Sequence, residues 1–147
     1  DYPCPAGGCL LTDPGFAKRV RDLMQHKPDF SLNDVHLLKF GRHFRLSPHL
    51  KLVVGRNEED NRKIQTFAQK GDILLKTFHH PGPLSLLRGE PNGIEIEKAA
   101  SITVRYSKAK DLKRVEILYR KVKEESNRSI FVSSIPDERF KDLMVGE

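Results

Sequence analysis

The sequence predicts an α+β fold, because stretches with helical spacing and stretches with strand alternation follow one another without the strict strand–helix–strand order of a parallel sheet. Of the 147 residues, 37% are apolar and 31% are charged, which is typical of a globular chain. A chain of this length can bury a core without disulfides or metal ions. We therefore expect mixed strands and helices in a compact domain preceded by a helical segment.

The first helices are expected from their capping residues. Asp13-Pro14 is typical of an N-cap followed by a first helical residue, and this helix should end near His26. Ser31 and Asp34 have the spacing of a capping box, which predicts a short second helix. The residues expected to face inward from the first helix are Phe16, Val20, Leu23 and Met24.

Three more helices are expected further along the chain. Asn57 should cap the first of them, because the three acidic residues that follow match the positive end of a helix dipole, and Gly71 should end it. Another should run from about Glu95 to Ala109, and Pro136 should open the last. The residues expected to face inward are Ile64, Phe67 and Ala68 in the first of these helices, Ile96, Ala99, Ala100 and Thr103 in the second, and Phe140, Leu143 and Met144 in the third.

Strands are expected where apolar and polar residues alternate, or where short apolar runs lie between turn residues. The first two should be joined across Ser47-Pro48, and the third and fourth should form a hairpin around the turn at 79–83. The expected strands are residues 43–46, 50–54, 72–78, 84–87, 115–119 and 130–132.

The positive charge is concentrated in one part of the chain. Between Lys98 and Arg128 there are ten basic and four acidic residues, and this surplus equals the net charge of +6. Such a stretch is typical of a surface that faces a polyanion, although it also fits a solvated helix face in a basic protein. The longest apolar runs are far shorter than the roughly 20 residues of a membrane span, so we expect a cytoplasmic protein that does not enter a membrane.

The segment from Cys4 to Cys9 contains the residues best suited to covalent chemistry. Cys9 lies a few residues before an expected helix N-terminus, where the dipole and the nearby Lys18 and Arg19 would lower the pKa of a thiol. Three other interpretations stay open: part of a zinc site, a transient disulfide, or plain structural cysteines. His79-His80 is equally open, as a metal or phosphate ligand or as a solvated pair.

Several short motifs between residues 55 and 123 occur in a specific order. They are Gly55-Arg56-Asn57 with Asn61, then Asp72-Ile73, Pro81-Gly82, Ala99-Ala100, and Tyr106-Ser107-Lys108-Ala109-Lys110 before the strand at Val115. In this order they resemble the RNA-binding module of the NFACT proteins, over about half of the chain. Two positions differ from that module: Leu74-Leu75-Lys76 stands where Trp-Phe-His is usual, and Pro83-Leu84 stands where Ser-His is usual.

The N-terminal segment carries a second resemblance. Gly8-Cys9-Leu10-Leu11, with Phe16 after it, is similar to the end of the catalytic domain of PP-loop tRNA thiouridylases. The resemblance implies that Cys9 carries the sulfur in an enzyme that activates a uridine with ATP. Cys4 is a second candidate catalytic residue, and a sulfur-donor protein is a possible partner. The ATP-binding loop of that family is absent from the 147 residues, so this chain alone is not expected to be catalytic.

These patterns together predict two parts and one interface. Residues 1–48 should be the tail of a catalytic PP-loop domain with a helical linker, and residues 49–147 an NFACT-type RNA-binding domain. The predicted function is tRNA binding within a thiouridylation enzyme, and the alternative is a non-catalytic RNA-binding module with structural cysteines. No metal or cofactor is expected in this chain. The residues expected to contact RNA are Arg56, Lys76, Arg105, Lys108, Lys110, Lys113 and Arg114.

Overall fold

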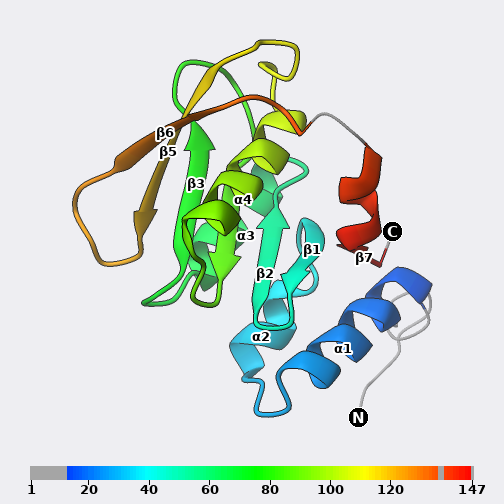
Figure 1. The fold of residues 1–147 in the computed structure, drawn as a ribbon. Coiled ribbons are helices and arrows are strands. Elements are labelled where there is room, and N and C mark those ends of the chain that lie inside the picture. Colours follow the sequence, from blue (N-terminus) through cyan, green and yellow to red (C-terminus); the bar gives the residue numbers. More distant parts are fainter. Residues whose placement is uncertain (1–12, 136–137, 147) are drawn as a thin grey trace.

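A central antiparallel sheet with helices on both faces forms the fold (Figure 1). The computed structural model describes residues 13–135 and 138–146. Over these residues seven strands pair in the order β6-β5-β3-β4-β2-β1-β7. The α+β prediction is therefore confirmed. The elements are α1 (Pro14–His26), α2 (Leu32–Leu37), β1 (Arg42–Ser47), β2 (Leu50–Val54), α3 (Glu58–Phe67), β3 (Ile73–Thr77), β4 (Ser85–Arg88), α4 (Gly93–Arg105), β5 (Val115–Lys121), β6 (Arg128–Val132), the 3₁₀ helix η2 (Glu138–Leu143) and β7 (Met144–Val145).

The core lies on both faces of the sheet, because successive side chains of a strand point to opposite faces. Leu52 and Val54 of β2 belong to the larger apolar cluster, which α4 covers with Ala99. Val53 points the other way and packs in a second cluster with Ile64 of α3. All five residues of β2 are buried, which explains its nearly continuous apolar sequence.

The local start signals of three helices are confirmed. The Asp13 carboxylate accepts hydrogen bonds from two backbone N–H groups of α1, and Asn57 caps α3 through the N–H of Asp60. Ser31 and Asp34 form the expected capping box at the start of α2. The hairpin of β3 and β4 is confirmed as well, as is the pairing of β1 with β2.

Several helix predictions need correction. Met24 was expected to face inward but is 53% exposed. The helix after Asn57 ends at Phe67, before Gly71, because the backbone of Ala68 is already extended. The helix α4 starts at Gly93, since Asn92 and Glu95 form a capping box there, and it ends at Arg105 rather than Ala109.

The C-terminal helix was also predicted inaccurately. Its described part is a 3₁₀ helix, and Met144 belongs to β7, which pairs with β1. Phe140 is buried in the main core as expected. Pro136 lies outside the described residues.

Residues on either side of the expected boundary at 48 belong to one sheet, since β1 and β2 are neighbouring strands. The assignment of residues 1–48 to the tail of a catalytic domain stays a prediction. Among the described helices, none has the length and apolar character needed to cross a membrane.

Candidate RNA-binding interface

Three loops meet at the end of the sheet where β2 and β3 finish and β4 begins. They are residues 55–57 after β2, residues 78–84 between β3 and β4, and residues 106–110 after α4, and we call them the interface loops. The backbone N–H of Gly55 donates to the carbonyl of Leu84 at 3.0 Å, and that of Lys108 donates to the carbonyl of Pro81 at 2.9 Å. The middle loop is therefore hydrogen-bonded to both of its neighbours.

The Gly55-Arg56-Asn57 motif with Asn61 builds the first of these junctions. The side-chain oxygen of Asn61 accepts the N–H of Leu84 at 3.1 Å. Gly55 lies so close to this amide that a Cβ at position 55 would collide with it. These motif residues thus hold the loop between β3 and β4 in place.

Arg56, expected to contact RNA, precedes α3 and is bound to a carboxylate in the first turn of that helix. Its Nε donates to Oδ2 of Asp60 at 2.7 Å, and its backbone N–H donates to the same oxygen at 3.0 Å. Burial alone would raise the pKa of the Asp60 carboxyl, but the hydrogen bonds from Arg56 outweigh it and lower that pKa. The guanidinium therefore stabilises the start of α3, while its side chain stays 43% exposed.

The second junction joins Pro81-Gly82 to the loop after α4. A Cβ on Gly82 would lie 2.8 Å from Cβ of Ser107 and 2.9 Å from Oγ1 of Thr77, so only glycine permits this approach. The buried hydroxyl of Ser107 donates to the carbonyl of Val104 and accepts the N–H of Ala109. The two matched motifs are therefore parts of one interlocked structure.

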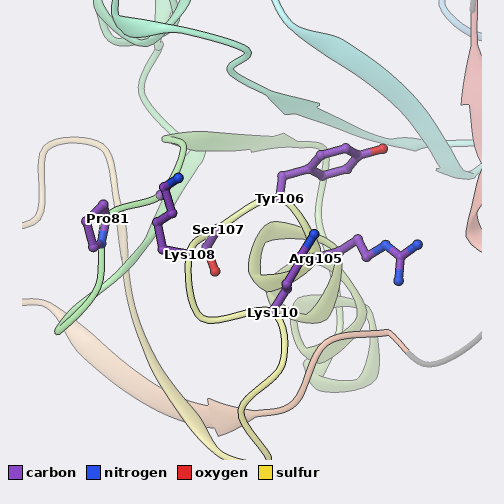
Figure 2. A pocket seen from close by; sticks show the side chains of 7 residues that line it. Pro81, Arg105, Tyr106, Ser107, Lys108 and Lys110 are labelled. Carbon is purple, nitrogen blue, oxygen red and sulfur yellow. The ribbon is translucent and has the colours of Figure 1, made fainter.

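Two clefts open on these loops and adjoin at Gly82, and together we call them the interface groove. One has a volume of about 460 Å³, and the other about 390 Å³. Figure 2 shows the first, with Lys108 beside Pro81, and with Lys110 of the loop and Arg105 at the end of α4 further along the cleft. The second is lined by Glu58, Asn61, Arg62, Gln65, Lys76, Gly82, Pro83 and Leu84.

The groove is rich in cations. Four of the seven residues expected to contact RNA line it, namely Lys76, Arg105, Lys108 and Lys110. Among the described residues that line it, Glu58 supplies the single carboxylate. The arrangement favours a polyanion, since the cations outnumber the acid.

The other three expected residues lie outside the lining of the groove. They are Arg56, Lys113 and Arg114. Lys113 is exposed, and the guanidinium of Arg114 lies over the ring of Phe131, 4.3 Å from its centroid. Arg62 and Gln65 were missed, although Glu58, Asn61, Arg62 and Gln65 have the i, i+3, i+4, i+7 spacing of one helix face.

The residues considered for metal or thiol chemistry give no second site in the described part of the chain. His79 lies 3.2 Å from the carboxylate of Glu116 and packs on the ring of Phe78. Within residues 13–135 and 138–146, no three His, Cys, Asp or Glu side chains gather in a group that could hold a metal ion. Cys4 and Cys9 lie outside the described residues.

Comparison with known proteins identifies a family for the part of the chain that contains the interface loops. A model of the NFACT protein RNA binding domain matches residues 41–144. The chain belongs to the NFACT RNA-binding domain family. The resemblance seen in the motifs is thereby confirmed, whereas nothing in these comparisons indicates a PP-loop thiouridylase.

Two known proteins are similar to parts of this chain. The Rqc2 homolog RqcH of Bacillus subtilis is 37% identical over 76 residues, which is 50% of this chain and 13% of that protein. The C-terminal part of the fibronectin/fibrinogen-binding protein from Streptococcus suis has a similar fold, with a TM-score of 0.64 and 13% identity. That match covers 89% of this chain and 68% of the solved one, and it shows the fold alone.

Proposed function

We propose that this chain is a non-catalytic RNA-binding module that holds the phosphate backbone of RNA in the interface groove. The observation that carries the proposal is the set of five cations, Arg62 among them, around two clefts that meet at Gly82. Each lysine or arginine that neutralises a phosphate releases counterions, which supplies much of the affinity of such proteins.

The rigidity of the groove favours a folded RNA such as tRNA. Backbone hydrogen bonds from Gly55 and Lys108 hold the loops at fixed positions. A folded RNA presents its phosphates at fixed spacing, so little ordering is required of either partner. We propose tRNA as the ligand on this basis, and a cytoplasmic location with it.

The test is filter binding of tRNA over a range of salt concentrations. Replacing Lys108 and Lys110 together by alanine should weaken binding, and the slope of log K against log salt should fall by about 1.5, because two phosphate contacts are lost. The control is Lys70→Ala, since Lys70 is exposed and lies in the turn before β3, at the opposite end of the sheet. Affinity that does not vary with salt, or a double variant that binds like the control, would contradict the proposal.

The sulfur-transfer hypothesis rests on the sequence of the N-terminal segment. In it, Cys9 and Cys4 belong to a site completed by a PP-loop domain elsewhere in a longer protein, which would also require ATP and a sulfur donor. Replacing Cys9 by serine in that protein should abolish thiouridine in tRNA, measured by nucleoside mass spectrometry. Unchanged thiouridine would refute this role and leave the RNA-binding proposal intact.

A further inference from the structure

Three basic side chains lie in a row across neighbouring strands, on the face of the sheet covered by α1 and α2. Lys51 of β2 is directly opposite Arg45 of β1 on one side and Arg88 of β4 on the other. Like charges in directly opposite positions destabilise a sheet. Such a row needs compensating anions.

The two outer members of the row have their anions. Arg45 donates to Oδ2 of Asp22 at 2.7 Å. Arg88 directs its N–H groups to the carboxylates of Asp72 and Asp34, to the side-chain oxygen of Asn33, and to a backbone carbonyl. All three nitrogen atoms of the Arg88 guanidinium therefore donate hydrogen bonds. In Arg45, Nε and Nη2 donate to Asp22, but Nη1 does not.

Lys51, in the middle, has no carboxylate within hydrogen-bond distance, although Asp22 and Asp34 act on its charge from further away. Its residue is only 8% exposed, and within residues 13–135 and 138–146 its ammonium makes no hydrogen bond or ion pair. Burial, together with the charges of Arg45 and Arg88, outweighs the opposing effect of the Asp22 and Asp34 carboxylates and lowers the pKa of Lys51 to about 7. A buried cationic side chain without a partner is costly, and such positions occur where a ligand completes the site.

A cavity of about 290 Å³ opens at this lysine. Besides Lys51 and Arg45, the side chains of Lys27, His26 and His49 line it, and all of these can donate hydrogen bonds. Two carboxylates also line the cavity. Asp34 is already bound by Lys27 and Arg88, and Asp29 is exposed.

We propose that this cavity binds one phosphate group, with Lys51 and Arg45 as its main ligands. A phosphate monoester presents several acceptor oxygens, which suits a wall where donor side chains outnumber the two carboxylates, and it would supply an anion in direct contact with the middle of the row. The cavity exceeds the size of one phosphate and is bordered by the exposed residues Pro48 and His49, so a group attached to the phosphate can extend outward. The phosphate is either that of a small molecule or the terminal phosphate of an RNA.

This site is separate from the interface groove. Leu84, in the groove, precedes β4, whereas the cavity is lined by Arg88 and Gly89 at the other end of that strand. The inference therefore does not rest on the proposed function, and either can fail alone.

The first test is calorimetric titration with inorganic phosphate at constant ionic strength. Replacing Lys51 by methionine should weaken phosphate binding by about tenfold or more, since a charge-assisted hydrogen bond is lost. The matched control, Lys70→Met, should bind like the wild type. Absence of phosphate binding by the wild type, or equal binding by the Lys51 variant, would overturn the proposal.

A second test uses the unaltered protein. Trace acetylation with acetic anhydride near pH 7.5, read by peptide mass spectrometry, should modify Lys51, and inorganic phosphate should slow this reaction without slowing that of Lys70. The same protection of Lys51 is then measured with adenosine monophosphate and with short RNAs that carry a 5′-phosphate or a 5′-hydroxyl. Protection by the monophosphate alone identifies a small-molecule site, and protection by 5′-phosphorylated but not 5′-hydroxyl RNA identifies an RNA end. No protection of Lys51 by any phosphate would refute the site.

Discussion

The largely buried side chain of Lys51 couples the stability of the fold to pH. In the unfolded chain a lysine has its ordinary pKa of 10.5, whereas burial beside Arg45 lowers the pKa of Lys51 in the folded protein to about 7. Between these values the unfolded state binds more protons than the folded state. Lys51 destabilises the fold most below pH 7, where it is charged in both states. As pH rises from 7 towards 10.5, this destabilisation decreases and the free energy of unfolding increases.

Replacing Lys51 by methionine should stabilise the protein in the absence of phosphate. Methionine keeps an unbranched apolar stem but removes the unpaired charge, so the free energy of unfolding should rise by about 2–4 kcal/mol near pH 7. Urea denaturation at pH 7 and at pH 9.5 measures this. The gain should shrink at the higher pH, and a gain that is equal at both values would contradict the assignment of the titration to Lys51.

At the scale of elements, the interface loops are held by contacts that require particular small or polar residues. Gly82 lies against Ser107 and Thr77, and the hydroxyl of Thr77 donates to the carbonyl of His80 at 2.5 Å. The carbonyl of Pro81 accepts the backbone N–H of Lys108. The position of Lys108 in the groove thus depends on how closely the two loops approach.

Replacing Gly82 by alanine should separate these loops. The expected cost is about 1–3 kcal/mol of stability, because the added methyl group meets the Cα and Cβ of Ser107, and tRNA affinity should fall with it. Gly93→Ala is the matched control, since no atom lies within 4 Å of a Cβ at that helix start. Denaturation and filter binding compare the two variants. Equal behaviour of both would show that the loop contact does not matter.

At the scale of the whole molecule, the C-terminal segment completes both the core and the support of the groove. β7 adds to the sheet beside β1, and the ring of Phe140 packs against those of Phe44 and Tyr106, with centroids 6.2 and 6.1 Å away. The guanidinium of Arg105 lies over the ring of Phe140. Two residues that line the groove, Arg105 and Tyr106, are therefore in contact with a side chain far along the sequence.

Replacing Phe140 by alanine should cost about 3–4 kcal/mol, because a buried aromatic ring is lost from the main core. Phe131→Ala removes a ring that is 49% exposed on β6 and should cost less than about 1 kcal/mol. Chemical denaturation of both variants provides the measurement. If the Phe140 variant were as stable as the Phe131 variant, the C-terminal segment would not be part of the folded core.

The features that the sequence predicts correctly are those determined by residues close together along the chain. The caps at Asp13, Ser31 and Asn57 were foreseen because each hydrogen bond spans only two or three residues. The hairpin of β3 and β4, and the ordered motifs that mark the family, follow from short patterns as well. The basic stretch singled out Arg105, Lys108 and Lys110, which line the groove in the structure, and their contact with RNA stays a prediction.

Tertiary structure alone decided which charged residues are paired and which are not. No pattern along the chain distinguishes Lys51 from an exposed strand lysine, because its burial comes from α1 and α2 and its arginine neighbours from β1 and β4. Likewise, the pairing of Arg56 with Asp60 and the place of Arg62 in the groove could not be read from the sequence, and RNA contact by Arg56 stays a prediction. Whether a charged side chain is paired or buried depends on segments that are distant in the sequence. Local propensities and charge counts carry no information about such contacts.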